Sequence, residues 1–451
     1  MFRPGSARSR GFANDRFEDQ PVPIPTERFA VNRRLRSLGV PLAAAVLATA
    51  AVTTITTLGP VDADTTSAAS PGKHRQAVVA AHRGSPGLAP EETLASYQRA
   101  LAEGADVLEG DVQLTADGEL VLVHDDTLAR TTDVETVFPE RAQGLVGDFT
   151  LAEIKRLDAG SWFDPRFAGQ RVPTVRELLE LNRGRAGLTL ELKAPQNSPG
   201  VGAKLAEELR AAGLADGAIL RSGAYRVKVH SRDETALREF HAVAPKVQLA
   251  VLTGGKMLDD AMLDALAGWT VGVFAHPRVT TAADIDRAHA RGLKVFSDPV
   301  DSPAQIEMAL HQRYDWVVTN HPETALRVRA GKDAFPGQGA VVVDHVFPNP
   351  SGDDVQPETG EHVTLRNTTA RPIDVSGHYV RDAASNLLRI GEGFTIQPGS
   401  LLRVYPGPGT NRPDAVYNGL TAGFLNNTGG DTVTLYSPGH RVLDTHSYIV
   451  P

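Results

Sequence analysis

From Ala77 to Thr319, short apolar runs alternate with segments in which apolar residues recur every three or four positions. A short apolar run bounded by turn residues is typical of a buried strand, and the longer recurrence is typical of an amphipathic helix. The runs that predict strands are 77–81, 106–112, 188–192, 226–231, 247–251, 271–275, 293–297 and 316–319. Strands that alternate with helices predict a parallel sheet, and eight of them close a TIM (β/α)8 barrel. We therefore predict this α/β barrel over residues 77–329.

Capping residues mark helix boundaries between these strands. Thr150-Leu-Ala-Glu153 and Thr174-Val-Arg-Glu177 have the spacing of capping boxes. Segment 92–103 carries apolar residues at helical spacing and stops before Gly104, a residue type that favours helix ends.

The Asp117-Gly118 pair between two apolar runs predicts a β-hairpin inside the barrel sequence. If these are the two loop residues of a primed turn, the residue numbers of each cross-strand pair sum to 235, and Asp111 faces His124 across the strands. A second insertion, residues 126–173, follows the hairpin and contains several aromatic residues. Loops after strand ends build the sites of barrel proteins, so we expect this insertion to cover a pocket.

The pattern changes after Arg329. Residues 330–338 predict a linker, and residues 339–451 contain short β-rich runs separated by turn residues. This pattern predicts an all-β, immunoglobulin-like sandwich. Its histidines are scattered along the segment and form no catalytic constellation.

The chain before Ala77 predicts three segments. Residues 1–36 are rich in Arg, Pro and polar residues without periodicity, which predicts disorder. Residues 37–63 follow three closely spaced arginines and begin with an uncharged apolar stretch. They predict either a cleaved signal peptide or an uncleaved membrane anchor formed by residues 37–61. Residues 64–76 predict a linker. With either a signal peptide or an anchor, we expect a secreted or extracytoplasmic protein.

Composition narrows the chemistry. The net charge of -8 comes with acidic and basic residues intermixed, which argues against nucleic acid as a partner. The chain contains no cysteine, which excludes disulfides, thiolate ligands and a lipid-modified cysteine. Any bound metal ion must therefore take oxygen and nitrogen ligands.

Carboxylates on predicted strands indicate a metal site. Glu109 and Asp111 lie two residues apart, so their side chains face one side of a strand. Two adjacent buried carboxylates repel each other unless a cation compensates. Glu191 and Lys193 share a face of a later strand, the acid suited to the metal and the lysine to a phosphate. Oxygen ligands favour Ca²⁺ or Mg²⁺, with Mn²⁺ also possible.

Two histidines lie at strand ends, where barrel enzymes place catalytic groups. His82 follows the first predicted strand, and His124 follows the second strand of the hairpin. Two imidazoles can divide the base and acid roles between them, in an order that the sequence leaves open. Arg83 adds a fork of donors that matches a phosphate. Together these groups predict a metal-assisted phosphoryl site.

Ordered motifs run through residues 77–328. They include His82-Arg-Gly, Ala89-Pro-Glu-Glu-Thr93, Leu108-Glu-Gly-Asp-Val, Val123-His-Asp-Asp-Thr-Leu, Leu157-Asp-Ala-Gly-Ser-Trp162 and Leu190-Glu-Leu-Lys193. In this order they resemble the glycerophosphodiester phosphodiesterase family. The runs Glu361-His-Val-Thr-Leu-Arg-Asn367 and Leu425-Asn-Asn-Thr-Gly-Gly-Asp431, within residues 340–450, resemble the lamin-tail domain.

The first resemblance implies hydrolysis of a glycerophosphodiester to sn-glycerol 3-phosphate and an alcohol. It implies that His82 and His124 are the acid–base histidines and that Arg83, with Lys193 and Glu91, binds the phosphate or substrate. It implies that Glu109, Asp111 and Glu191 are the metal ligands. Glu91 either contacts the site or fixes its loop. Two alternatives stay open: a phospholipase D-like or phosphoinositide-cleaving barrel enzyme, and a non-enzymatic envelope-binding protein.

Two departures from the family pattern concern substrate choice. The usual Pro-Glu-Asn-Thr is Pro90-Glu-Glu-Thr93 here, and the usual tryptophan-bearing motif after the seventh strand is Val295-Phe-Ser-Asp-Pro299. The C-terminal sandwich is expected to bind a cell-envelope or polymer ligand. Because it contains no candidate catalytic group, removal of residues 338–451 is expected to change the turnover of small soluble diesters only a few-fold.

Overall fold

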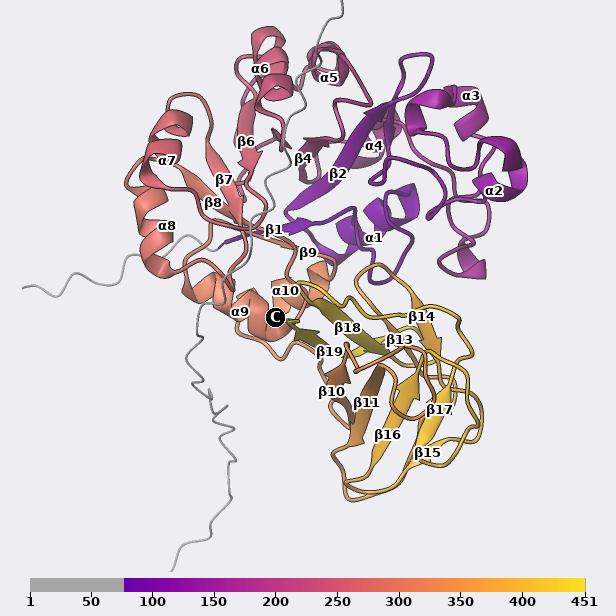
Figure 1. Ribbon diagram of the computed structural model, residues 1–451. Coiled ribbons are helices and arrows are strands. Elements are labelled where there is room, and N and C mark those ends of the chain that lie inside the picture. The colour runs from indigo at the N-terminus through magenta and orange to yellow at the C-terminus, as the bar shows by residue number, and fades with distance from the viewer. Residues whose placement is uncertain (1–76, 451) are drawn as a thin grey trace, which may run out of the picture. The chain divides into compact units, whose positions relative to one another are not determined.

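The computed structural model describes residues 77–450 (Figure 1). The segments predicted over residues 1–36, 37–63 and 64–76 lie outside the described residues. Within residues 77–450, no helix is both long enough and apolar enough to cross a membrane.

Eight parallel strands form a closed barrel (Figure 1). They are β1 (Val78–Ala81), β2 (Val107–Leu114), β4 (Gly187–Leu192), β5 (Val227–Ser231), β6 (Gln248–Leu252), β7 (Gly272–Ala275), β8 (Lys294–Ser297) and β9 (Trp316–Thr319). Each strand pairs with the next one in chain order, and β1 pairs with both β2 and β9. The predicted TIM barrel is confirmed, with strand ends within about two residues of the predicted ones.

Helices surround these strands (Figure 1). They are α1 (Leu94–Glu103), α4 (Val175–Asn182), α5 (Val201–Ala211), α6 (Glu234–Val243), α7 (Asp260–Ala267), α8 (Ala282–His289), α9 (Pro303–His311) and α10 (Pro322–Arg329). Thr150 and Thr174 form the predicted capping boxes. Helix α1 begins two residues later than predicted, because the Thr93 side chain accepts a hydrogen bond from Ser96 N and caps the helix there.

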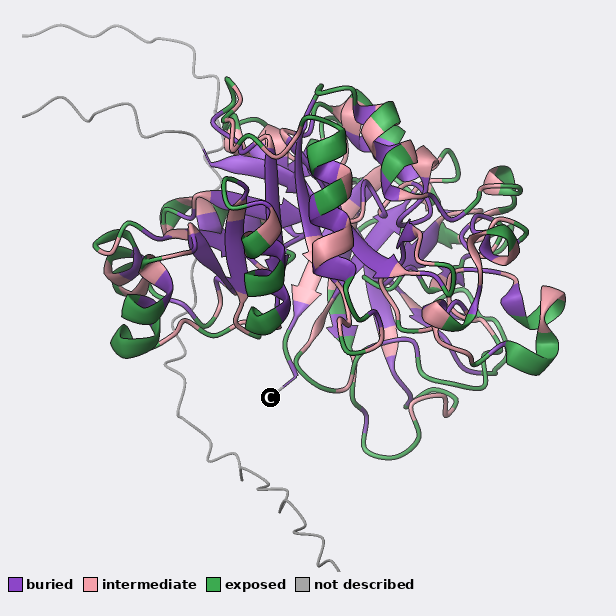
Figure 2. Ribbon diagram, turned by 90° about the horizontal axis from the view of Figure 1, so that it is seen from above, coloured by how far each residue is buried: buried purple, intermediate pink, exposed green. Residues whose placement is uncertain are grey.

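Two apolar cores hold the barrel together. One lies between strands and helices and includes Leu108, Val229 and Phe240. The other fills the barrel interior and includes Phe296 and Trp316. Figure 2 shows the buried strands enclosed by helices whose outer faces are exposed. Val78, Val107 and Trp316, each the first residue of its strand, belong to this interior core.

The hairpin is present, but its predicted register is wrong. Strand β3 (Leu120–Leu122) pairs antiparallel with β2 through Leu114 with Leu120 and Val112 with Leu122, so partner numbers sum to 234. The turn has three loop residues, because Thr115 N donates to Glu119 O at 3.0 Å. Every primed two-residue turn needs a positive φ at its first loop residue, whereas here Gly118, at φ 78°, has a positive φ and Asp117 does not.

The shifted register separates Asp111 from His124 along the strands. Asp111 O instead accepts a hydrogen bond from Val123 N at 2.9 Å. Strand β3 ends at Leu122, so His124 lies beyond the ladder and its direction does not follow from the strand register.

The insertion over residues 126–173 forms a small subdomain on the hairpin. It contains the short helices α2 (Val134–Val137) and α3 (Leu151–Ile154) and three 3-10 turns, η1 (Pro139–Arg141), η2 (Val146–Asp148) and η3 (Pro165–Phe167). Its apolar side chains pack on Val121 and Val123 in a cluster of their own. The insertion therefore supports the strand that leads to His124.

The C-terminal part is all-β. Its strands are β10 (Val341–Phe347), β11 (His362–Asn367), β12 (Ile373–Asp374), β13 (Tyr379–Arg381), β14 (Leu387–Arg389), β15 (Thr395–Ile396), β16 (Leu401–Tyr405), β17 (Ala415–Tyr417), β18 (Asp431–Tyr436) and β19 (Val442–Tyr448). Two four-stranded sheets, β10-β11-β16-β17 and β14-β13-β18-β19, enclose an apolar core. The predicted immunoglobulin-like sandwich is confirmed.

Side chains of strands β13 and β18 bond to barrel loops. Tyr436 Oη donates to Gly87 O at 2.6 Å, and Arg381 Nη2 donates to Phe163 O at 2.7 Å. Thr434 Oγ1 lies 3.2 Å from His321 Nε2. The first of these contacts supports the loop that follows β1.

Candidate active site

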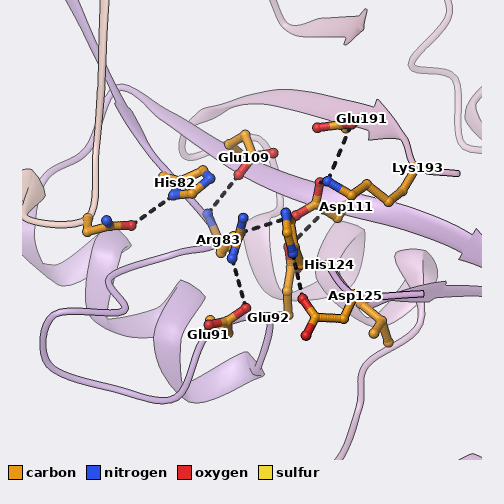
Figure 3. A network of polar contacts seen from close by, with 12 residues as sticks. His82, Arg83, Glu91, Glu92, Glu109, Asp111, His124, Asp125, Glu191 and Lys193 are labelled. Atoms are coloured by element: carbon orange, nitrogen blue, oxygen red, sulfur yellow. Dashed lines mark hydrogen bonds and ion pairs between the residues drawn. The ribbon is translucent and has the colours of Figure 1, made fainter. Parts of the chain in front are cut away.

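Three carboxylates, two from the middle of β2 and one from near the end of β4, lie close together (Figure 3). Asp111 of β2 is the cross-strand partner of Glu191 of β4, and Glu109 lies two residues earlier on the same face of β2. Glu109 and Asp111 are 3% and 1% exposed. Spacing predicted the pair Glu109 and Asp111, the family resemblance added Glu191, and the barrel register brings the three together.

The carboxylates perturb each other strongly. Burial, followed by the charge of Asp111, raises the pKa of Glu109 well above its ordinary value and the pKa of Glu191 to about 8. Burial acts in the same direction on Asp111, but Lys193 and Arg83 hold its pKa below the ordinary value. Asp111 Oδ2 accepts no hydrogen bond from the described residues. Buried carboxylates in excess of their hydrogen-bond donors fit a divalent cation.

Two overlapping sets of side chains could hold such an ion. One set is Glu109, Glu191 and His230, and the other is Glu92, Glu109 and Asp111. Within each set the candidate ligand atoms lie within 4.8 Å of one another. Neither His230 nor Glu92 was predicted from the sequence to be a ligand.

His82, at the end of β1, is oriented by an amide. Its Nδ1 lies 2.8 Å from Asn320 Oδ1, which can only accept, so the proton is on Nδ1 and Nε2 is the free acceptor. Asn320 is held in turn by Asp301, whose Oδ2 accepts from Asn320 Nδ2 at 2.7 Å. Burial, followed by the positive charge of Arg83, lowers the pKa of His82 to about 3. The ring is therefore neutral at ordinary pH.

His124 begins a chain of charged contacts. Its Nδ1 donates to Asp125 Oδ1 at 2.7 Å, and Arg130 Nε donates to the other oxygen of Asp125 at 2.7 Å. Arg130 also donates to both oxygens of Glu91, at 2.8 and 2.7 Å. Glu91 Oε1 accepts from Arg83 Nη1 at 3.0 Å. This chain connects the loop after β1 to the loop after β3.

Two cationic side chains flank the acids. Arg83 Nε lies 3.3 Å from Asp111 Oδ2, and Lys193 Nζ lies 3.7 Å from Asp111 Oδ1. An open groove of roughly 550 Å³, lined by Lys193, Arg232 and Asp126 among others, begins beside them. Cations next to a carboxylate cluster suit an anion that bridges a metal ion and the protein.

The backbone of Arg83 has a strained conformation. Its φ of 51° is in the left-handed region, which costs energy for a residue with a Cβ. Its N–H donates to Glu109 Oε2 at 2.8 Å, so the strained turn also fixes a carboxylate.

Residues 82–324 match the model of the Glycerophosphoryl diester phosphodiesterase family. The chain belongs to this family. Residues 335–449 match the Lamin Tail Domain model, as the sequence predicted for the C-terminal part. The predicted phosphodiesterase class is confirmed at the level of the family.

Curated relatives of this phosphodiesterase cover its barrel. A glycerophosphodiester phosphodiesterase of Bacillus subtilis is 32% identical over 266 residues, 56% of this chain and 86% of that protein. One of Caldanaerobacter subterraneus is 33% identical over 258 residues, 56% of this chain and 98% of that protein. Among solved structures, an Oleispira antarctica phosphodiesterase in complex with the product sn-glycerol-3-phosphate is 28% identical, with a TM-score of 0.49 over 56% of this chain and 96% of that one.

The predicted site residues of the phosphodiesterase lie together. Figure 3 shows them in one cluster, and they are His82, Arg83, Glu91, Glu109, Asp111, His124, Glu191 and Lys193. Glu91 fixes its loop through two arginines, one of the two roles left open for it. Contact between Glu91 and substrate stays a prediction.

Several groups that support these residues were not predicted from the sequence. Asp125 stood inside a recognised motif and Arg130 just after it, and neither received a role. Asn320 and Asp301 lie more than 200 residues from His82 along the chain. Only one local signal was available: His230 is a polar residue within a predicted buried strand.

Glu92 stands where the family pattern has asparagine. Its φ is 56°, a region that asparagine tolerates better than glutamate. Its Oε1 accepts from Asp111 N at 2.9 Å, and its Oε2 accepts from Tyr97 Oη. Burial, followed by the charge of Asp111, raises the pKa of Glu92 well above its ordinary value. In this structure Glu92 supports strand β2.

Proposed function

We propose that this protein is a metal-dependent phosphodiesterase that hydrolyses glycerophosphodiesters to sn-glycerol 3-phosphate and an alcohol. One observation carries the proposal: two oriented imidazoles, an arginine and a lysine converge on a buried carboxylate cluster at the carboxyl end of a barrel (Figure 3). Membership of the family supplies the substrate class.

Glu109, Asp111 and Glu191 would hold the cation, with Ca²⁺, Mg²⁺ and Mn²⁺ as the ions that the sequence favours. When bound, a divalent cation neutralises phosphate charge and polarises the phosphoryl group. Arg83 and Lys193 would bind the remaining phosphate oxygens, since both already lie beside Asp111.

The hydrogen bonds of the two histidines favour a division of roles. His82 is neutral with Nε2 as a free acceptor, so it is suited to take the proton of the attacking oxygen. His124 donates a hydrogen bond from Nδ1 to the Asp125 carboxylate, so its Nε2 is suited to give a proton to the leaving alcohol. We therefore assign the base role to His82 and the acid role to His124.

Two further parts of the proposal rest on the sequence. Residues 37–63 support export, so the enzyme would act outside the cytoplasm; sequencing the amino end of the mature protein from culture medium and membrane fractions tests this. The lamin-tail domain would bind a cell-envelope or polymer ligand; a pull-down of the full chain with purified envelope polymers tests that part.

The reaction is tested with the full chain and defined diesters. Purified protein with added Ca²⁺, Mg²⁺ or Mn²⁺ is expected to release sn-glycerol 3-phosphate from glycerophosphocholine or glycerophosphoethanolamine, measured with a coupled dehydrogenase. Release of choline from sphingomyelin, or of inositol phosphate from a phosphoinositide, would support the alternative cleavage classes instead. If no diester turns over and a Glu191→Gln variant behaves like the parent, the binding-protein alternative is favoured.

A further inference from the structure

The strand that follows β4 in the barrel brings an imidazole to the carboxylates. His230 of β5 is in register with Glu191 of β4, which is in register with Asp111 of β2. The three residues form one row across neighbouring strands, and residues in register present their side chains to the same face. His230 is 2% exposed, so it is part of the barrel interior.

The two ring nitrogens of His230 have different surroundings. Nδ1 lies 3.1 Å from Thr189 Oγ1, at hydrogen-bonding distance. Nε2 lies 3.9 Å from Glu109 Oε1, too far for a hydrogen bond. The ring also stacks on Phe274, with 4.8 Å between centroids and 27° between planes. Packing on one face and a bond at Nδ1 thus fix the ring with Nε2 beside the acids.

We propose that His230 Nε2 ligates the same cation as Glu109 and Glu191, which makes the site a mixed carboxylate–imidazole centre. The inference rests on the proposed function only in sharing its metal site. The candidate ligand atoms of these three residues lie within 4.8 Å of one another. Ligands about 2.1 Å from one ion lie about 3.0 Å apart at a right angle and about 4.2 Å apart when opposite. The 3.9 Å between Nε2 and Oε1 falls inside that range.

Thr189 lies where it can hold the His230 ring in the tautomer that binds a metal ion. A metal-bound histidine usually donates its other ring N–H to an oxygen, which fixes the tautomer that ligates. The Thr189 hydroxyl can accept that proton at Nδ1 and leave the Nε2 lone pair for the ion.

An imidazole ligand changes which metals the site prefers. Ca²⁺ and Mg²⁺ take oxygen ligands, whereas imidazole suits Zn²⁺ and other transition ions. The phosphodiesterase is therefore expected to bind Zn²⁺ more tightly than Ca²⁺, in contrast to the preference that the carboxylates alone predict.

Calorimetric titration of the metal-free full chain tests the ligand. His230→Phe keeps a ring against Phe274 and removes both nitrogens, and Thr189→Val removes only the hydroxyl. His311→Ala, at an exposed histidine of α9, is the matched control. His230→Phe is expected to weaken Zn²⁺ binding at least tenfold and Ca²⁺ binding less than threefold, with an intermediate Zn²⁺ loss for Thr189→Val, as typical of lost support.

Spectroscopy gives a second readout. In the Mn²⁺-loaded protein, electron spin echo experiments should show coupling to an imidazole nitrogen that His230→Phe abolishes and His311→Ala retains. Retained coupling, or unchanged Zn²⁺ affinity in both His230→Phe and Thr189→Val, overturns the proposal; if His230→Phe does not fold, Thr189→Val decides. Metal binding that depends on His230 without diester turnover would instead overturn the proposed function alone.

Discussion

Replacing Asp301 by asparagine should change which nitrogen of His82 carries the proton. The Asp301 carboxylate accepts from Asn320 Nδ2 at 2.7 Å and from Asn320 N at 2.7 Å. The first bond turns the amide oxygen of Asn320 toward His82 Nδ1, 2.8 Å away. An amide at position 301 would face Asn320 Nδ2 with its own N–H groups. The Asn320 side chain is then expected to rotate and to donate to Nδ1, which moves the ring proton to Nε2.

The cost to catalysis should exceed the cost to stability. With Nε2 protonated, His82 can no longer accept a proton from the attacking oxygen. Loss of a positioned general base lowers turnover by about 10²–10⁴-fold, which is about 3–5 kcal/mol of the barrier. Asp301→Asn replaces charge-assisted bonds by neutral ones, which costs about 1–3 kcal/mol of the free energy of unfolding. The variant should therefore remain folded at assay temperature.

A swapped pair separates this reasoning from simple damage. In the double variant Asp301→Asn with Asn320→Asp, the carboxylate at position 320 can accept from both the ring N–H of His82 and the amide at position 301. Turnover of glycerophosphocholine should recover to within about tenfold of wild type, and ¹⁵N spectra of labelled histidine should show the Nδ1–H tautomer again. A double variant as inactive as the single one, or a single variant with more than a third of wild-type turnover, would refute the orientation of His82 by Asp301.

Four further outcomes are expected. Glu191→Gln should retain the fold but lose metal binding in a calorimetric titration, together with turnover, because the cation loses a charged ligand. His124→Ala should lower turnover of glycerophosphocholine about 10²–10⁴-fold and that of a nitrophenyl diester far less, because nitrophenolate leaves without a proton. Removal of residues 338–451 should reduce kcat more than tenfold in a truncated protein that stays soluble, since Tyr436 supports the loop after β1. Burial raises the pKa of Glu361 to about 7, so the folded state keeps its proton longer than the unfolded state. The free energy of unfolding should then fall as pH rises from about 4.3 through 7, and Glu361→Gln should flatten this dependence in urea titrations.

The expected effect of removing the C-terminal domain differs from the few-fold change that the sequence analysis predicts. That prediction follows from the absence of catalytic groups after residue 338, and none of the site residues is found there. It takes no account of packing: Tyr436 bonds to Gly87 O and Thr434 contacts His321, the residue after Asn320. Contacts of this kind have no local sequence signal, because they depend on how two domains meet.

The strands and the carboxylate pair could be predicted because their signals are local. Runs of four to seven residues define the strands, and the spacing of Glu109 and Asp111 alone sets their common face. The hairpin register failed for an equally local reason. Thr115 Oγ1 donates to Asp117 Oδ1 at 2.6 Å, and Leu151 N donates to the same oxygen at 2.9 Å. These bonds hold Asp117 outside the positive-φ region that a primed turn requires.

The depth of a polar residue inside a barrel is harder to predict than its face. Lys228 and His230 are two residues apart on β5, so strand periodicity places both toward the interior. Lys228 Nζ lies among the rings of Phe274, Phe296 and Trp316, at 4.3, 3.7 and 4.5 Å from their centroids, and burial lowers its pKa well below the ordinary value. His230, one pleat further, lies beside Glu109. The level at which packed rings give way to polar groups is set by the stagger between neighbouring strands, which no single strand sequence contains. A sequence can therefore place an imidazole inside the barrel, and only the closed sheet brings it to the level of the carboxylates.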